Sequence, residues 1–327
     1  MKIKRIMTST AIAALALCSC LLLFGCGPQG SKDAPLASTI EDTLLVTPGT
    51  LTVGINSANA PFGGESNGSI VGIDVDTAAA LATELGLKLV VIDTNGQNPA
   101  QMLSEGKVDL VTSLTGLSQT ESGIAYVGPY LENGPALFGK TSGDAATVDL
   151  NTLGGTKIGA YVGSIAASAA SAYCGSENIV SFMSLSEAFD ALQAGEVAYV
   201  ASDLVAGGYL ALSYDGIDYV ASLQSPSGLY LGANFTNAGL VSAVDAALKT
   251  IESNGVLETV AAKWTGKKCA EHTVPSATAT TQEPAAAEQQ PAAEQQPAEE
   301  QPAAEEQPAE EAPADEYTEE YYEEEEY

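Results

Sequence analysis

The sequence predicts an α/β fold of two lobes, each with its own mixed and mostly parallel sheet. Two observations favour this fold. Short β-rich runs alternate with helical segments between about residues 44 and 266, and the alternation occurs twice, over 51–112 and over 157–201. Strand–helix–strand order requires parallel pairing through a crossover helix, so each round predicts one sheet with helices packed against it.

The first round starts with the β-rich run 51–55. Apolar residues then recur at helical spacing over 75–85, and Gly86 ends that helix. The remaining predicted elements are a strand over 88–92, a short helix over 99–105 closed by Gly106, and a strand over 108–112.

The second round starts with a strand over 157–161, after which Gly163 and Ser164 open a helix of small residues over 165–173. Ser184 and Glu187 have the spacing of a capping box, which predicts a helix over 188–194. The other predicted elements are strands over 178–182 and 197–201 and closing helices over 240–252 and 257–264.

The N-terminus has the features of an export signal over 1–25. Three of the first five residues are basic, and the apolar run over 12–24 has 13 residues, fewer than the roughly 20 that span a bilayer. The run leads into LFGC over 23–26, which resembles the bacterial lipobox. The resemblance implies cleavage before Cys26, a palmitate-bearing lipid on that residue, and a tether over 26–43. An ordinary secretory signal is the alternative.

Acidic residues dominate the composition, with 42 Asp and Glu against 12 Lys and Arg and a formal net charge of −30. Nucleic acid is therefore not an expected partner, because phosphate binding needs clustered basic residues. Residues 276–327 hold 17 of the acids, no Lys or Arg, and repeated Pro, Ala, Glu and Gln, which predicts a disordered tail. A solvated, self-repelling tail is the simpler interpretation, and a spacer, adhesive end or partner-binding segment is the alternative.

Cysteine and histidine usage predicts neither a metal site nor a cofactor. The signal and the lipobox account for three of the five cysteines, which leaves Cys174 and Cys269 as a possible disulfide or as two free thiols. There is no CxxC, and the single histidine, His272, is interpreted as a surface residue, so zinc is not expected. No dinucleotide, Walker or HExxH motif occurs.

An ordered set of short motifs resembles the bacterial extracellular solute-binding proteins of family 3, the polar amino-acid type that captures ligands for ABC importers. In chain order the motifs are 51–55 (LTVGI), 61–62 (PF), 71–76 (VGIDVD), 103–109 (LSEGKVD), 129–130 (PY), 162–164 (VGS), 191–195 (ALQAG), 201–203 (ASD) and 263–266 (KWTG).

This resemblance implies a periplasmic-binding-protein-like fold of type II, with two sheets joined by a two-strand hinge that closes on ligand. Lobe one would span 44–139 plus 229–268, and lobe two would span 140–228. The implied partners are a small-molecule solute, an ABC transporter permease and the membrane through the N-terminal lipid. The implied protein is a monomer on the extracytoplasmic face of the bacterial membrane.

The resemblance also implies a ligand site at the strand ends of both lobes. It assigns hydroxyl and backbone donors to 113–115, the α-carboxylate to the helix start at Ser164, and the α-ammonium to Asp203. The full set of implied ligand-binding residues is Asn56, Asn59, Phe62, Ser113, Thr115, Thr120, Ser164 and Asp203.

The sequence departs from the family pattern where a carboxylate would bind. The family's clamping arginine falls at Thr120, or at Glu121 or Ser122 with another gap, and the only arginine of the chain, Arg5, lies in the signal. A charge-assisted hydrogen bond is worth roughly 1.5–3 kcal/mol, so losing this clamp costs about 10- to 100-fold in affinity.

Other departures weaken the amino-acid site further. Asn59 replaces a common stacking aromatic, Asn56 a common Asp, and Ile165 a common hydroxyl, while Gly96 lies near a second usual aromatic. We therefore predict a neutral polar or cationic solute without a free α-carboxylate, or with one bound only by N–H dipoles. Four aromatic residues are interpreted either as faces for a cation or as packing residues: Phe62, Tyr126, Tyr130 and Tyr161.

The expected function is capture of a small polar solute and its delivery to an ABC importer. The alternative is a ligand-sensing or adhesive surface lipoprotein with the same bilobed fold. An enzyme is not expected, because the only titratable groups of the matched cleft loops are Asp203, Glu65 and Glu121, with no histidine or arginine beside them.

Overall fold

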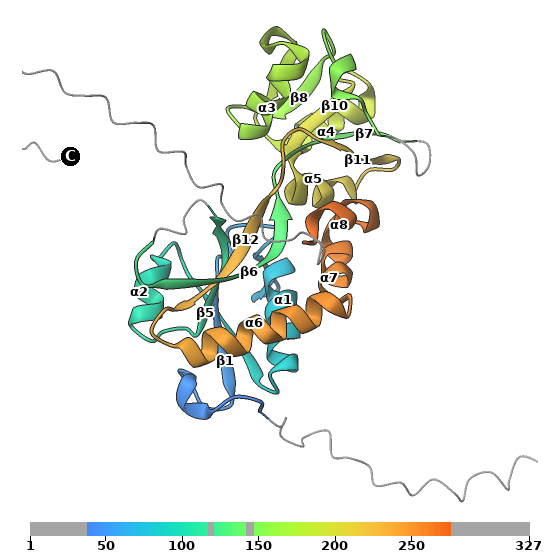
Figure 1. Cartoon of the computed structure of the whole chain (residues 1–327). Coiled ribbons are helices and arrows are strands. Elements are labelled where there is room, and N and C mark those ends of the chain that lie inside the picture. The colour runs from blue at the N-terminus through green and yellow to red at the C-terminus, as the bar shows by residue number, and fades with distance from the viewer. Residues whose placement is uncertain (1–37, 117–120, 142–146, 276–327) are drawn as a thin grey trace, which may run out of the picture. The chain divides into compact units, whose positions relative to one another are not determined.

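The computed structural model describes residues 38–116, 121–141 and 147–275 (Figure 1). The predicted export signal, Cys26, the site residue Thr120 and the acidic tail lie outside these residues. Among the described helices, none is both long enough and apolar enough to cross a membrane.

The first sheet has the strand order β4-β1-β5-β12-β6. β1 pairs in parallel with β4 and β5, whereas β12 is antiparallel to β5 and β6. Its strands are β1 (Thr50–Ile55), β4 (Lys88–Asp93), β5 (Leu110–Thr115), β6 (Ile124–Asn133) and β12 (Ser227–Asn234). A small hairpin, β2 (Gly64–Ser66) and β3 (Ser69–Val71), follows β1.

Helices cover both faces of this sheet. Three helices bury their apolar residues in one core cluster with Leu51, Val53 and Leu110: α1 (Ile73–Glu84), α6 (Ala238–Ser253) and α7 (Val256–Thr265). On the other face, α2 (Pro99–Ser104) packs Met102 and Leu103 against Val111. Leu110 and Val111 face opposite sides because side chains alternate along a strand.

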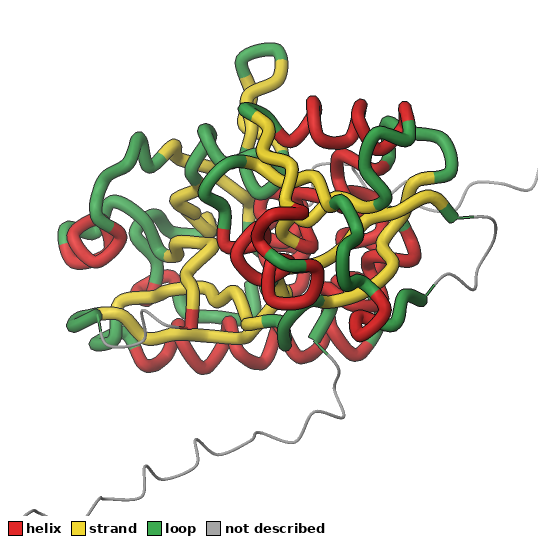
Figure 2. The backbone as a smooth tube through the Cα atoms, turned by 90° about the horizontal axis from the view of Figure 1, so that it is seen from above, coloured by secondary structure: helices red, strands yellow, loops and turns green. Residues whose placement is uncertain are grey.

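The second sheet has the order β11-β7-β10-β8-β9. β8 is parallel to β9 and β10, and β7 is antiparallel to β10 and β11. Its strands are β7 (Pro135–Lys140), β8 (Ile158–Tyr161), β9 (Ile179–Phe182), β10 (Tyr199–Asp203) and β11 (Ile217–Ser222). Its helices are α3 (Ile165–Cys174), packed on one face, and α4 (Leu185–Ala194) and α5 (Leu204–Ala211), packed on the other. Figure 2 shows the helices of the molecule, in red, flanking its strands, in yellow.

The observed sheets confirm the predicted α/β class with two mixed sheets. Each sheet has two parallel and two antiparallel strand pairings, so the expectation that the sheets are mostly parallel is wrong. Two connections join them, one from β6 to β7 and one from β11 to β12, which Figure 1 shows running between the lobes. The predicted lobe boundary at residue 139 is wrong, because Pro135 already pairs with Asp203 in the second sheet. The first crossing lies at Gly134, between the end of β6 at Asn133 and the start of β7 at Pro135.

The helix starts follow the predicted capping residues. The Ser184 hydroxyl accepts the Glu187 N–H at 3.2 Å, and the Glu187 carboxylate accepts the Met183 N–H at 3.1 Å. Gly195, in a left-handed conformation, ends this helix α4. At α3, the Ser164 hydroxyl accepts the Ala167 N–H at 3.1 Å.

The sequence pattern missed α5 and α8 (Lys267–Thr273), as well as β6, β7, β11, β12 and the hairpin. α5 contains Gly207 and Gly208, which are poor helix formers in isolation. Both are required by packing: a Cβ at Gly207 would lie 2.2 Å from Phe138 Cε2, and one at Gly208 would lie 2.6 Å from Cys269 Sγ. The described residues also include three short 3₁₀ helices, Asp42–Leu44, Leu150–Thr152 and Ser176–Asn178.

The two described cysteines are both free and buried, so the possible disulfide between Cys174 and Cys269 is wrong. Cys174, the last residue of α3, packs with Leu137 on one face of the second sheet, whereas Cys269 packs with Phe138 on the other face. The sheet therefore separates the two thiols. His272 is exposed, as predicted, with its ring centroid 4.3 Å from that of Tyr219.

Candidate functional site

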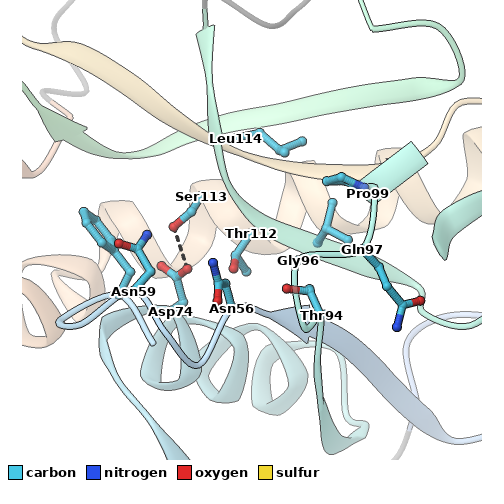
Figure 3. A pocket seen from close by; sticks show the side chains of 13 residues that line it. Asn56, Asn59, Asp74, Thr94, Gly96, Gln97, Pro99, Thr112, Ser113 and Leu114 are labelled. Carbon is cyan, nitrogen blue, oxygen red and sulfur yellow. Dashed lines mark hydrogen bonds between the residues drawn. The ribbon is translucent and has the colours of Figure 1, made fainter. Parts of the chain in front are cut away.

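A pocket of about 220 Å³ lies at the carboxyl ends of the parallel strands of the first sheet, where the sequence predicted one (Figure 3). We call it the lobe-one pocket. Four of the predicted site residues line it, namely Asn56, Asn59, Phe62 and Ser113. It is also lined by Gly54, Asp74, Thr94, Gly96, Gln97, Pro99, Val111, Thr112 and Leu114.

The loop after β1 holds the two asparagines in place. The Asn56 side-chain oxygen accepts the Ala58 N–H at 3.0 Å, and the Gly63 N–H donates to the Asn59 carbonyl at 3.0 Å. A Cβ at Gly63 would lie 2.4 Å from the Asn56 carbonyl oxygen, so only glycine allows this turn to close. The side-chain NH₂ of Asn56 is left as a donor, since the Asx turn uses only its oxygen.

A buried carboxylate lies beneath the pocket. Asp74, in the first turn of α1, accepts the Ser113 hydroxyl at 2.7 Å (Figure 3). It also accepts the Tyr130 hydroxyl at 2.7 Å. The Ser113 N–H donates to the Tyr130 oxygen at 3.1 Å, which closes the network. Burial raises the pKa of Asp74, although hydrogen bonds from Thr112, Tyr130 and Ser113 oppose the shift.

This network changes the expected role of Ser113. Both of its donors, the hydroxyl and the N–H, are used within the protein, so its hydroxyl can only accept a hydrogen bond from a ligand. Its φ of 58° is rare for a residue other than glycine. The bonds to Asp74 and Tyr130 therefore hold a strained bulge in β5, where the register with β12 shifts, and Thr112 and Leu114 beside it line the pocket. Thr115 is exposed and is not among the lining residues.

A second, larger pocket of about 590 Å³ lies at the carboxyl ends of β8 and β10. We call it the lobe-two pocket. Ser164 and Asp203, the two predicted site residues of this lobe, both line it. Its other lining residues are Tyr161, Gly163, Ile165, Ala166, Met183, Ser184, Leu185, Ala201, Ser202 and Ala206.

Asp203 is a carboxylate without a countercharge. Asp203 occupies the N-cap position of α5, but its side chain makes no capping bond. Its carboxylate has no hydrogen bond or ion pair with the described residues. The surrounding pocket walls desolvate it and raise its pKa. A carboxylate accepts hydrogen bonds only, so Asp203 suits a ligand that donates, above all an ammonium group.

Neither pocket is lined by lysine or arginine. Gln97 of the lobe-one pocket accepts a bond from Lys107 at 3.2 Å, but that ammonium is also paired with Glu105 at 2.7 Å. Glu121, one of the positions where the family arginine could fall, accepts the Asn98 NH₂ at 3.0 Å. The described part of the site therefore offers no positive side chain to a carboxylate.

Sequence reasoning missed several lining residues, including Asp74, Thr94, Gln97, Thr112 and Met183. Asp74 lies in the VGIDVD motif, but that motif marked only the family and carried no signal of burial. Among the aromatic residues, Tyr130 is core, with 1% exposure, and Tyr126 packs edge-on against Tyr230 at 6.2 Å. Phe62 and Tyr161 line the pockets.

Two sheets linked by two strand crossings, each with a pocket at its strand ends, define a bilobed solute-binding protein. Residues 51–267, about two-thirds of the chain, match the bacterial extracellular solute-binding proteins, family 3. The chain belongs to this family.

Curated relatives and solved structures agree with this assignment. The chain is 26% identical to the arginine-binding periplasmic protein of Mannheimia haemolytica, over 62% of this chain and 86% of that protein. It is 23% identical to the ABC transporter glutamine-binding protein GlnH of Bacillus subtilis, over 78% of this chain and 96% of that protein.

The fold matches solved structures of the same kind. A polar amino acid ABC uptake transporter substrate-binding protein from Streptococcus thermophilus has a TM-score of 0.59 and 20% identity, covering 67% of this chain and 87% of that one. The L-cystine solute receptor of Neisseria gonorrhoeae, in its unliganded open conformation, has a TM-score of 0.58 and 21% identity, covering 68% and 94%. Family membership also agrees with the expectation of an extracytoplasmic binding protein that is not an enzyme.

Proposed function

We propose that this chain is the capture protein of an ABC importer and that its solute is a small amine without a free carboxylate. The solute would be amino-acid-like, or a neutral or cationic amine. It binds between the two pockets and closes the lobes about the β6–β7 and β11–β12 connections.

The observation that supports this proposal most directly is that no lysine or arginine is among the described residues that line the two pockets. Asp203 offers an unpaired carboxylate to an ammonium group, and the Asn56 NH₂ offers a neutral donor. A carboxylate would find only neutral donors in the described pockets, such as the Asn56 NH₂ and the N–H groups at the start of α3. The helix start favours an anion, but it does not supply the bidentate cation of an arginine. A ligand carboxylate would also add a second negative charge near Asp203.

We also propose that Cys26 carries a lipid that anchors the protein on the extracytoplasmic face of the membrane. The signal and lipobox pattern over 1–26 supports this anchor. Metabolic labelling with palmitate should mark the wild-type protein and leave Cys26→Ala unlabelled. Equal labelling of both proteins would contradict the proposal.

The solute class is tested with L-leucinamide and L-leucine, which differ in the carboxylate. We use residues 27–327, which contain every described helix and strand, and measure the dissociation constants by calorimetry. Leucinamide should bind at least about tenfold more tightly than leucine, the range expected for one unmatched charge. Tighter binding of leucine would overturn the proposal.

Asp203→Asn is the matched variant for the ammonium contact, because it preserves the shape of the side chain and removes its charge. It should weaken leucinamide binding by about 10- to 100-fold, as expected for losing a charge-assisted bond. Asp190→Asn, on the exposed face of α4, serves as the control and should leave the dissociation constant unchanged. An unchanged affinity in Asp203→Asn would show that this carboxylate does not hold the amine.

A further inference from the structure

The lobe-two pocket combines one unpaired carboxylate with an unusual amount of exposed apolar surface. Ile165 and Met183 are the two most exposed large hydrophobic side chains among the described residues, at 73% and 76%, and both line this pocket. Tyr161, 47% exposed, lines it as well. Large apolar groups gathered at one concave site usually mark a binding surface.

Both residues are held at the starts of helices. Ile165 is the first residue of α3, directly after its cap Ser164. The Met183 N–H donates to Glu187 at 3.1 Å just before α4 begins. The backbone at both positions is therefore fixed, and the two side chains form the walls of a preformed pocket that also contains Asp203.

We infer that Ile165 and Met183 determine specificity for an amine whose charged nitrogen is attached to an apolar group of several carbons. The ammonium pairs with Asp203, and the apolar group covers the two side chains and removes them from water. This inference rests on the proposed function, because it assumes that the lobe-two pocket receives the amine. It excludes polyamines and small polar amines as preferred solutes.

The test compares L-leucinamide with glycinamide, two amides that share the amine and lack a carboxylate but differ in the apolar side chain. Calorimetry on residues 27–327 should show at least about tenfold tighter binding of leucinamide, because even a single methylene in an apolar pocket can be worth that factor. Equal affinities for the two amides would overturn the inference. They would leave the proposed function standing if leucine still bound more weakly than leucinamide.

Two variants then test whether Ile165 and Met183 cause the preference for leucinamide over glycinamide. Met183→Gln and Ile165→Thr should each reduce the ratio of the two dissociation constants by several-fold, and the double variant should reduce it by about tenfold. Leu212→Gln, another exposed position of the second lobe that lines neither pocket, should leave the ratio unchanged. All of these side chains are exposed, so the melting temperature should stay within a few degrees of wild type.

Three other results would overturn the inference. If the variants weaken both amides equally, the two side chains contact the opposite lobe during closure and do not contact the solute. If the ratio of the two dissociation constants is unaffected, other residues of the pocket set the preference for leucinamide. If neither amide binds at millimolar concentration, both this inference and the proposed amine site are wrong.

Discussion

Asp74 is the most deeply buried acid among the described residues, at 1% exposure. One of its oxygens accepts the Ser113 hydroxyl and the other accepts the Tyr130 hydroxyl. Its partners come from β5 and β6, far apart in the sequence. The network has no charge to neutralise the carboxylate, so its stabilising effect depends on complete hydrogen bonding. The geometry of the lobe-one pocket therefore depends on a residue that itself offers little to a ligand.

Removing one hydroxyl from this network should be costly. Tyr130→Phe leaves an oxygen of Asp74 and the Ser113 N–H without their partner, and we expect the free energy of unfolding to fall by about 1–3 kcal/mol. Urea denaturation of residues 27–327 measures this change. Tyr230→Phe is the matched control, because its hydroxyl makes no described hydrogen bond; its effect should stay within about 0.5 kcal/mol. Equal effects of the two variants would contradict the network.

The raised pKa of Asp203 predicts how amine binding depends on pH. The ionised carboxylate binds an ammonium and the protonated form does not, so affinity should fall as the pH drops through this pKa, which burial raises above the ordinary range of an aspartate carboxyl. Affinity should also fall above about pH 8, where an α-amine loses its proton. Calorimetry with leucinamide across this range should give a maximum between the two limits. Affinity that increases toward acid pH would contradict the assigned ion pair.

At the scale of elements, α5 shows how tertiary contacts override a poor local pattern. Its residues Gly207 and Gly208 let the helix approach Phe138 on β7 and Cys269 on α8. Within α5, Leu204 belongs to the core of the second lobe, while Val205 belongs to the core of the first. The helix therefore touches both lobes, and its glycines set how closely these elements pack.

Gly207→Ala tests this close packing. The added methyl would overlap the fully buried Phe138 ring at 2.2 Å, and overpacking of this kind costs about 1–3 kcal/mol of unfolding free energy. The melting temperature should drop by several degrees. Gly154→Ala, at an exposed position with no atom within 4 Å of the new Cβ, is the control and should change little. A wild-type melting temperature for Gly207→Ala would show that the helix can move away.

At the scale of the whole molecule, the C-terminal helices connect the two lobes in addition to the two strand crossings. α5 contacts α7 and α8, and α8 contacts β6 and β11. Within α8, Cys269 belongs to the second-lobe core and Ala270 to the first-lobe core. The packing between the lobes is therefore not limited to the two strand crossings, and the proposed closure would have to accommodate the contacts of α8 with both cores.

The two buried thiols report on this global structure. Burial raises the pKa of Cys269 to about 12 and also raises that of Cys174, so neither should react with an alkylating reagent in the folded state near pH 8. Without any reductant, denaturation should expose two reactive thiols in residues 27–327, counted by mass spectrometry. Finding none after denaturation would restore the disulfide, and rapid labelling of the folded protein would contradict the burial.

Local pattern was enough to predict most of the helices and the parallel strands. Apolar periodicity and capping residues act over three or four positions, so α1, α3 and α4 were visible without knowledge of their neighbours. β7 escaped, because it follows β6 directly and has no α-helix on either side in the chain to mark it. The ordered motifs predicted the family, which the match over 51–267 confirmed.

The sequence by itself determined the fold class, the missing arginine and the acid at the end of β10, because each is a property of residue type and order. Only the tertiary structure decided that Ser113 uses its donors on Asp74, that the two cysteines lie on opposite faces of a sheet, and that the first crossing lies at Gly134. It also brought Ile165 and Met183 to the same pocket as Asp203. These facts depend on contacts between residues distant in the chain, which no local pattern records.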